Sequence, residues 1–463
     1  MLTFLPPVKA FVEKNLKCDP EQAKYVMFSF DFFFYVMASY YILKPLRDLT
    51  GVMLGNTSSL FRWTMVAVLL VNPLFSMLMA RIPRVRLVPV IYRFFISHLV
   101  VFFIGFLAVG VGREAELQGT ARIIPSLFFV WVSVFNLFAV SLFWSVMADR
   151  FTGAQGRKVF GFIGAGGTLG QMAGSALATG LPAYLGVPSL LLVSSLLLEL
   201  SVRSRPSLDD VVLEQQKLEA KTIGASSKEK PKPWTGMMLV MKSPYLFGIC
   251  AYLFLYTFTS SFIYLQKQDL VAVAFPTDEA KLQFFAKVNF AVSGATLIIQ
   301  LFFTGRLIAA MGLIFSLSVM PGLTSVGFSV LALFPSLSLL AFFEATRTTL
   351  NYAIARPSRE ILFTVVSKED KYISKNFIDT FIYRAGDSIA SFAFDGLKVL
   401  RLGTTGISWA AVPFSVVWTG LAMGLGSAQR KKQKIQEEAL ARIKAEESGE
   451  IGITPVAEET SSP

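Results

Sequence analysis

The sequence predicts an all-α polytopic membrane protein with twelve transmembrane helices in two six-helix halves. Hydrophobic residues make up 54% of the 463 positions and charged residues only 16%. A soluble domain could not cover so much apolar surface. Apolar runs of about twenty residues, long enough to cross a bilayer as a helix, recur along the chain. A single long polar stretch divides them into two sets of six.

The twelve runs set the expected domain boundaries. The first six lie at residues 25–44, 58–80, 87–109, 122–147, 158–180 and 183–200, and the second six at 243–265, 281–304, 307–331, 336–355, 376–399 and 404–426. The stretch between the sets is rich in Lys, Glu, Ser and Pro, a composition typical of a soluble linker. We therefore expect a cytoplasmic N-terminal segment 1–24, a first half 25–200, a linker 201–242, a second half 243–426 and a charged tail 427–463.

Lysine and arginine residues gather in alternate loops. The basic segments are the N-terminal segment, the 81–86 loop, the 150–158 loop, the linker, the 356–375 loop and the tail. Cytoplasmic loops of membrane proteins carry an excess of these residues, so both termini are expected in the cytoplasm. This bias accounts for much of the net charge of +12. The basic charge therefore does not predict nucleic-acid binding. Membrane lipids are the expected partners of a protein with so many apolar spans.

The composition argues against catalytic chemistry. Only two cysteines, Cys18 and Cys250, and one histidine, His98, occur in the chain. Two cysteines cannot form a disulfide framework, and one histidine excludes most histidine-based metal sites. No nucleophile–base pair or metal-ligand cluster stands out in the sequence. We expect no enzyme activity, no metal and no cofactor.

Glycines repeat within the fifth predicted span. Gly166, Gly170 and Gly174 recur every four residues, a spacing that lets two membrane helices approach closely. A nucleotide-binding loop is the alternative. It is disfavoured because the G-x-G-x-x-G spacing is not kept, no Walker lysine follows and no strand precedes the glycines. The pattern predicts a helix-packing face.

The eleventh predicted span carries charges into an apolar segment. On a helical wheel its polar residues fall within one arc; they are Asn376, Thr380, Tyr383, Arg384, Asp387, Ser391, Asp395 and Lys398. A charge near the bilayer centre costs about 2.5–3.5 kcal/mol on insertion scales, so such residues face protein or water. The stripe predicts the wall of a hydrophilic path. Alternatively, Arg384 and Asp387 form a pair that only locks two helices together.

Polar residues in the other spans extend the candidate site. The candidate substrate-binding residues are Arg47, Asp48, Arg93, Asn136, Lys287, Glu344, Arg347, Asn351, Arg384 and Asp387. Five of these are cations, and guanidinium forks match phosphate or carboxylate groups. The set therefore predicts a small anionic substrate. Carboxyls inside a membrane can also relay protons, so the candidates for proton coupling are Asp31, Glu344 and Asp387.

Tyrosines align along the seventh predicted span. Tyr245, Tyr252 and Tyr256 lie on one helical face together with Thr259. The row either stacks on a planar group of a substrate or packs in the core as ordinary aromatic side chains. We favour core packing.

The arrangement of six spans, a basic central loop and six more spans is that of a major-facilitator-type secondary carrier. An RxPRxR turn between the second and third spans is loosely similar to the loop signature of that superfamily. Such carriers bind substrate near the membrane midplane between two halves.

Three segments resemble the ATP/ADP (nucleotide) translocase family. They are ILKPLRDLTGVMLG, FVWVSVFNLFAVSLFWSVMADRF and RPSREILFTVVSKEDKYISKNFIDTFIYRAGD. The resemblance, which covers essentially the whole transmembrane region, is to the free-living bacterial branch. It implies a twelve-helix major-facilitator-like fold. It also implies exchange of nucleoside triphosphate for diphosphate across a bacterial inner membrane.

The sequence departs from that family at one charged position. Exchangers of the family generally carry Lys-Asp at the end of the first span and Gly-Lys-Ser in the eleventh. Here the first reads Arg47-Asp48, which keeps the charge, and the second reads Gly386-Asp387-Ser388. The aspartate removes positive charge from the presumed phosphate site.

The sequence therefore predicts a secondary carrier that works by alternating access. Its expected substrate is a nucleotide of the ATP/ADP type or a related phosphorylated anion. Within transport, the alternative is a proton-coupled carrier of another organic solute. The alternative outside transport is a membrane scaffold in which the charges only order the packing of the helices.

Overall fold

The computed structural model describes residues 19–113, 117–151, 153–205, 235–367 and 377–447, together with positions 10, 12–14, 16, 370, 374 and 375. Within these ranges the secondary structure is entirely helical. The long helices of the first half are α2 (Pro20–Leu54), α3 (Thr57–Arg81), α4 (Arg84–Val109), α5 (Ile123–Arg150), α6 (Gly153–Gly180) and α8 (Leu190–Arg203). Short turns η2 (Gly119–Arg122), α7 (Pro182–Leu185) and η3 (Val187–Ser189) connect them.

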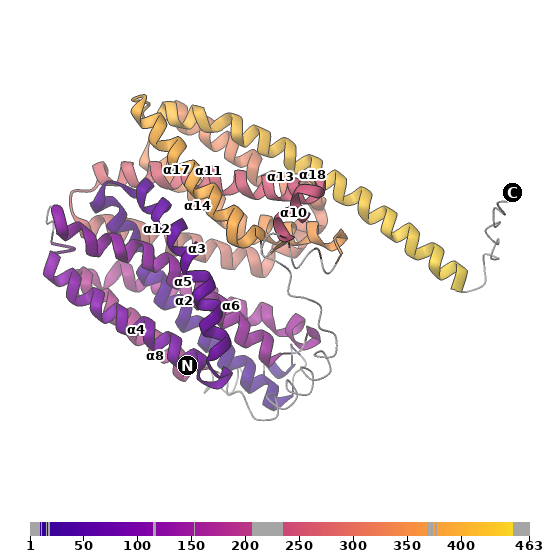
Figure 1. Cartoon of the computed structure of the whole chain (residues 1–463), viewed down its shortest axis with the longest axis horizontal. Coiled ribbons are helices and arrows are strands. Elements are labelled where there is room, and N and C mark those ends of the chain that lie inside the picture. The colour runs from indigo at the N-terminus through magenta and orange to yellow at the C-terminus, as the bar shows by residue number, and fades with distance from the viewer. Residues whose placement is uncertain are drawn as a thin grey trace, which may run out of the picture.

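The second half begins with the short helix α10 (Thr235–Lys242). Its long helices are α11 (Pro244–Ala274), α12 (Asp278–Phe302), α13 (Thr304–Leu333), α14 (Leu337–Leu350), α17 (Tyr383–Val399) and α18 (Thr404–Glu447). Two π-helical turns, η4 (Asn351–Ala355) and η6 (Ile378–Ile382), adjoin α14 and α17, and α15 (Arg356–Leu362) and η5 (Phe363–Val365) follow η4. Figure 1 shows the first half in indigo to magenta and the second half in pink to yellow.

Each of the twelve predicted spans coincides with a helix or with consecutive helical turns, so the chain is an all-α polytopic membrane protein. Eight of the described helices are long and apolar enough to cross a membrane by themselves. The other four are α6, which is rich in glycine, and the shorter α8, α14 and α17. These four segments need neighbouring helices to cover them, because polar and short segments are stable in a bilayer only when buried in protein.

The boundaries of the predicted linker and tail lie inside helices. Helix α8 continues to Arg203 and α10 already begins at Thr235, while residues 206–234 of the linker lie outside the described part of the chain. Helix α18 runs without interruption from the last predicted span to Glu447, and Figure 1 shows it extending beyond the bundle. Residues 430–439 and 441 of this helix are exposed, as the charged composition of the segment predicts.

Helix α2 is the central helix of the first half. It packs against α5, α6 and α8, and most of its 35 residues are buried. On α6, Gly166, Gly170 and Gly174 lie directly against the α2 backbone at Phe30, Phe34 and Ala38. A side chain at any of these glycines would meet a backbone carbonyl oxygen. The helix-packing interpretation of the glycine repeat is therefore confirmed.

The two halves meet through a few helices and share part of their apolar packing. The main hydrophobic cluster fills the first half and includes Leu282 and Ala286 of α12, and two other clusters fill the second half. Between the halves, α12 packs on α2 and α6, and α17 packs on α3. The α17–α3 contact includes an ion pair of 2.7 Å between Arg62 Nη1 and Asp395 Oδ2. This pair lies near the start of α3 and the end of α17, so it joins the halves at one end of the bundle.

The glycine face of α6 gives a first prediction. Gly170→Ala places a methyl group against the carbonyl oxygen of Phe34, and overpacking of this kind costs about 1–3 kcal/mol. We expect a lower unfolding temperature for the variant in detergent, measured by a thermal-shift assay. Gly164→Ala is the control, because a methyl group at Gly164 meets no atom within 4 Å. Equal unfolding temperatures for the two variants would contradict the tight packing of α6 on α2.

Candidate functional site

A cavity of about 230 Å³ lies between the two halves. Its lining comes from α2, α3 and α5 of the first half and from α11, α14 and α17 of the second. The lining residues are Arg47, Phe61, Thr64, Ser133, Tyr256, Ser260, Ser261, Ile263, Tyr264, Glu344, Arg347, Thr348, Arg384 and Asp387. Most of them are polar or charged, which is unusual inside an apolar protein and makes the cavity the candidate functional site.

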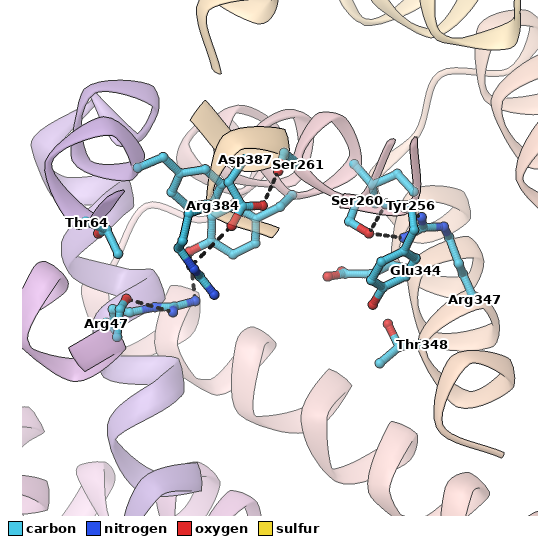
Figure 2. Close-up of a pocket in the computed structure, with 14 residues that line it drawn as sticks. Arg47, Thr64, Tyr256, Ser260, Ser261, Glu344, Arg347, Thr348, Arg384 and Asp387 are labelled. Atoms are coloured by element: carbon cyan, nitrogen blue, oxygen red, sulfur yellow. Dashed lines mark hydrogen bonds and ion pairs between the residues drawn. The ribbon is translucent and has the colours of Figure 1, made fainter. Parts of the chain in front are cut away.

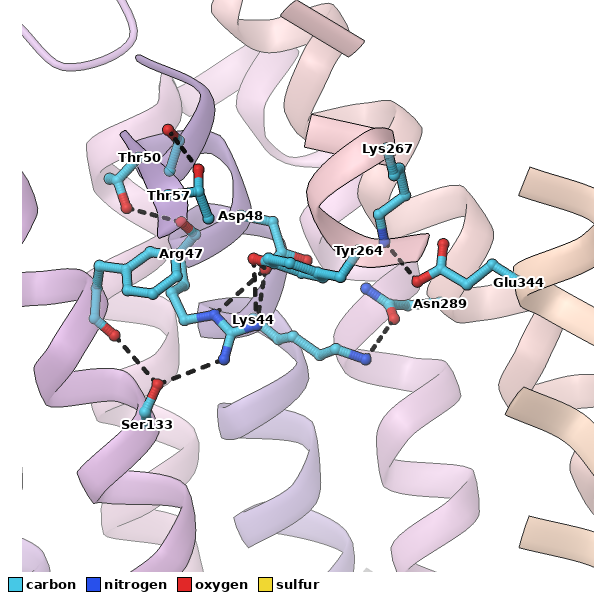
Figure 3. A network of polar contacts seen from close by, with 12 residues as sticks. Lys44, Arg47, Asp48, Thr50, Thr57, Ser133, Tyr264, Lys267, Asn289 and Glu344 are labelled. Carbon is cyan, nitrogen blue, oxygen red and sulfur yellow. Dashed lines mark hydrogen bonds and ion pairs between the residues drawn. The ribbon is translucent and has the colours of Figure 1, made fainter. Parts of the chain in front are cut away.

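Arg47 on α2 contributes a cation from the first half. Its Nε and Nη2 donate to Asp48 Oδ1 at 3.2 and 2.9 Å. Tyr264 on α11 donates its hydroxyl to the same oxygen at 2.6 Å. The carboxylate thus compensates the guanidinium, and a tyrosine of the second half holds an ion pair of the first (Figure 3).

Two lysines next to the cavity also have partners. Lys44 Nζ donates to Asn289 Oδ1 at 2.7 Å, which joins α2 to α12. Lys267 Nζ on α11 forms an ion pair of 2.7 Å with Glu344 Oε1 on α14. Lys267 is buried, and Glu344 keeps part of its surface toward the cavity. Figure 3 shows these contacts as one polar layer across the halves.

Helix α17 contributes Arg384 and Asp387 one turn apart. Arg384 Nη1 lies 3.2 Å from Asp387 Oδ2, and Ser261 on α11 donates to Asp387 Oδ1 at 2.9 Å. The aspartate therefore compensates the arginine inside the cavity. It also ties α17 to α11.

Arg347 on α14 has a different environment. It is 5% exposed, and its guanidinium donates to Thr324, Ser260 and Thr259 and to the main-chain oxygen of Tyr256, at 2.7–3.1 Å. All of these acceptors are neutral, and among the described residues Arg347 makes no ion pair. Its charge is therefore held in a fixed position without a compensating carboxylate.

Figure 2 shows that the charged groups lie at two sides of the cavity. Arg47, Arg384 and Asp387 are grouped on one side. Glu344 and Arg347 lie on the other, together with Tyr256, Ser260 and Thr348. The second side has one cation without a carboxylate partner, Arg347. Glu344 beside it is partly open to the cavity, although its Oε2 atom is buried and accepts no hydrogen bond. A ligand there can accept from the arginine and contact the exposed part of Glu344.

The structure brings seven of the predicted site residues together. Arg47, Glu344, Arg347, Arg384 and Asp387 line the cavity. Asp48 and Asn351 contact its lining: Asp48 accepts from Arg47, and Asn351 Nδ2 donates to the Tyr256 hydroxyl at 2.9 Å.

Four predicted residues lie away from the cavity lining. Arg93 is mostly exposed and pairs with Glu199 at 3.0 Å, between α4 and α8. Lys287 is exposed on α12. Asn136 on α5 and the buried Asp31 on α2 do not line the cavity. Helical periodicity locates a polar residue on a face, but it does not tell which faces of different helices meet.

The polar stripe of the eleventh span divides along α17. Arg384 and Asp387 line the cavity, whereas Asp395 pairs with Arg62, and Lys398 pairs with Asp269 at 2.9 Å. Asn376 and the side chain of Thr380 lie outside the described part of the chain. Arg384 and Asp387 of the stripe thus line the cavity, whereas Asp395 and Lys398 form contacts between helices further along α17.

The tyrosine row also divides. Tyr245 and Tyr252 are buried and donate to the main-chain oxygens of Leu362 and Leu317. Core packing, the favoured interpretation, applies to these two residues. Tyr256 lines the cavity instead.

Sequence reasoning missed several polar residues of the site. They are Lys44, Thr64, Ser133, Ser260, Ser261, Tyr264 and Lys267. Lys267 was missed because the polar run after residue 265 indicated the end of the seventh span. In the structure α11 continues to Ala274 and buries this run against neighbouring helices. The i,i+3 spacing of Tyr264 and Lys267 was an available signal.

Comparison with known proteins places the fold. No family model matches the sequence, and no curated protein matches it. The structure is similar to that of the nucleoside transporter NupG, with a TM-score of 0.54 and 13% identity over 88% of this chain and 98% of that one. It is also similar to a bacterial homologue of the human lysosomal transporter Spinster, with a TM-score of 0.48 and 14% identity over 92% of this chain and 98% of that one. The likeness to NupG, with the helical architecture, shows that the fold is major-facilitator-like.

The Lys267–Glu344 pair gives the second prediction. Lys267→Met leaves a carboxylate without its cation, and breaking a buried pair costs about 3–5 kcal/mol. Because Glu344 is partly open to the cavity, we expect a loss near 3 kcal/mol, measured by thermal unfolding in detergent. The double variant Lys267→Met, Glu344→Gln should recover most of that loss, since no unpaired charge remains. If the loss of stability in the double variant equals the sum of the losses in Lys267→Met and Glu344→Gln, the ion pair does not couple α11 to α14.

Proposed function

We propose that this protein is a secondary transporter that carries a phosphorylated organic anion by alternating access, with a nucleotide as the leading substrate. The observation that carries the proposal is Arg347, a buried cation without a carboxylate partner that lines a cavity between the two halves. Carriers of this fold type bind substrate between two halves that rock around a central site.

The charge of the cavity supports an anionic substrate. A buried guanidinium with only neutral partners is costly, and a ligand that brings negative charge relieves that cost. Its fork geometry suits a phosphate or carboxylate group. Tyr256, Tyr264 and Phe61 also line the cavity and offer ring faces for a planar group such as a base.

The remaining ion pairs limit the number of negative charges that the site accommodates. Arg47 is compensated by Asp48, and Arg384 is compensated by Asp387. Arg347 therefore remains as the lining arginine without a carboxylate partner. This balance favours an anion with one phosphate over a triphosphate, and it supports nucleotide transport of a kind other than ATP/ADP exchange.

The contacts between halves support alternating access. The Arg62–Asp395 ion pair joins α3 to α17 toward the 55–57 and 400–403 loops, and Ser388 donates to Met65 Sδ at 2.9 Å nearer the cavity, next to the lining residues Thr64 and Asp387. The basic loops predict that this end faces away from the cytoplasm. On that orientation, these contacts close the cavity on the outer side. They are few and polar, so they can break when the halves rock.

A proton-coupled carrier of an uncharged organic solute is the second candidate. Two carboxyls, Glu344 and Asp387, line the cavity, and Glu344 Oε2 has no hydrogen-bond donor. A hydroxyl-rich ligand such as a nucleoside would supply donors to it. NupG, whose fold is similar, is described as a nucleoside transporter.

Arg347 provides the third prediction. Arg347→Gln removes a charge-assisted contact worth about 1.5–3 kcal/mol, roughly ten- to a hundredfold in affinity. We expect the KM for labelled AMP in proteoliposomes to rise by that factor, with partial recovery in Arg347→Lys. Arg93→Gln is the matched control, since Arg93 is a cation of the same membrane region that lies away from the cavity. Unchanged kinetics in Arg347→Gln protein that still inserts in the membrane would remove this residue from the site.

Asp387 provides the fourth prediction. If its charge compensates Arg384, Asp387→Asn should bind anions more tightly and keep its pH profile, and Asp387→Lys should shift preference toward ADP and ATP. If it carries a coupled proton, Asp387→Asn should instead lose the pH dependence of uptake. The measurement is competition by AMP, ADP and ATP at two pH values, in wild type and both variants. An unchanged ranking of the three competitors throughout would exclude Asp387 from the substrate path.

A further inference from the structure

A second buried arginine, Arg359 on α15, has an environment like that of Arg347. It is 8% exposed, and its Nη1 donates to the Tyr383 hydroxyl at 2.9 Å. Among the described residues, no hydrogen bond is found for its Nε or Nη2 and no ion pair for its charge. Neither nitrogen is among the fully buried unsatisfied atoms, so both retain contact with solvent and can be reached by a ligand. A mostly buried cation without a carboxylate partner is stabilised by an anion that binds it.

Arg359 and Arg347 share one aromatic ring. The Cζ atoms of Arg347 and Arg359 lie 5.2 and 5.3 Å from the centre of the Tyr256 ring. The two guanidinium carbons are therefore no more than about twice that distance apart. Tyr256 is held in place beside both arginines, because its hydroxyl accepts from Asn351 at 2.9 Å. Tyr256 itself lines the cavity.

The two arginines lie at different distances from the cavity, with Arg347 at the cavity and Arg359 toward the predicted cytoplasmic loop. Arg347, Asn351 and Arg359 lie in this order along α14, η4 and α15. All three contact Tyr256 of α11, so they lie on the side of this helical segment that faces α11. The cavity lies at the Arg347 end. The other end runs into the 356–375 loop, which the positive-inside bias places in the cytoplasm. Asn351 Oδ1, between the two arginines, is buried without a hydrogen-bond partner.

We propose that Arg359 forms a second oxyanion site, at which the phosphate group of the substrate binds on its way between the cytoplasm and Arg347. This inference rests on the proposed function and adds an entry site to it. Two cations without carboxylate partners, both beside the Tyr256 ring, let a phosphate pass from one guanidinium to the next. Neither step then leaves the anion without a partner in an apolar interior.

Binding of inorganic phosphate tests the entry site directly. Thermal unfolding of the purified protein is followed against phosphate concentration, because a ligand that binds only the folded state raises the unfolding temperature. We expect Arg359→Gln to weaken apparent phosphate affinity about tenfold, and Arg359→Lys to recover part of the loss. The double variant Arg347→Gln, Arg359→Gln should lose phosphate stabilisation altogether. Wild-type affinity in Arg359→Gln would overturn the entry site.

Tyr383→Phe separates binding from a structural role. It removes the one hydrogen bond of Arg359 and leaves the cation in place, so the phosphate affinity should stay near that of wild type. If Tyr383→Phe loses as much phosphate affinity as Arg359→Gln, the arginine acts only through its contact with α17 and the entry site is wrong.

Two further comparisons distinguish the possible failures. If Arg347→Gln retains wild-type phosphate affinity while Arg359→Gln loses it, the proposed central site fails and the Arg359 site stands. The titration is repeated in nanodiscs of phosphatidylcholine with and without phosphatidylglycerol. We expect equal phosphate affinity in nanodiscs with and without phosphatidylglycerol. Competition by phosphatidylglycerol that disappears in Arg359→Gln would assign Arg359 to a lipid headgroup and overturn its role in substrate entry.

Discussion

The cost of removing a charge from water governs the arrangement of this protein. A buried ion is stable only when a partner compensates it, and removal of one partner is strongly destabilising. The charged side chains between the halves follow this rule: Arg47 lies against Asp48, Lys267 against Glu344 and Arg384 against Asp387. The Lys267–Glu344 pair joins α11 to α14. Beside the Arg384–Asp387 pair, Ser261 donates to Asp387 and joins α11 to α17. The same rule makes Arg347 and Arg359 conspicuous, since their partners among the described residues are neutral.

Apolar packing predominates within the first half, and polar contacts are prominent between the halves. Within the first half, α2 and α6 pack through glycines at backbone distance, and a single aromatic-rich core surrounds them. Close packing of this kind resists deformation. Between the halves, hydrogen bonds and ion pairs such as Lys44–Asn289 and Arg62–Asp395 are prominent. Polar contacts can exchange with water when they open, so two rigid halves joined in this way suit the rocking motion that we propose.

Tyr256 and Tyr264 connect the charge layer to the cavity. Tyr264 binds Asp48 of the first half through its hydroxyl, and its ring lies 5.7 Å from Arg47 Cζ. Tyr256 lies beside two arginines of the second half. Both come from α11, which therefore carries the aromatic surface toward cations of both halves. A ligand with a planar group and an anionic group would meet both kinds of side chain in one cavity.

The sequence by itself determined the class of the fold and the chemistry of the site. The length of the apolar runs predicted the twelve helical segments, and the four-residue glycine repeat predicted the α6 packing face, because both depend on local spacing along one helix. Charged residues inside apolar spans identified Arg347, Arg384 and Asp387, since such residues are too costly to be scattered. Only the tertiary structure decided which of these side chains converge. Arg93 and Arg347 look alike in the sequence, yet one lies exposed beside Glu199 and the other lines the cavity. The structure also placed Lys267 inside α11, although its polar neighbours in the sequence indicated that the helix had already ended. In each case the deciding factor is which faces of separate helices meet, a property of packing between distant segments that no local pattern contains.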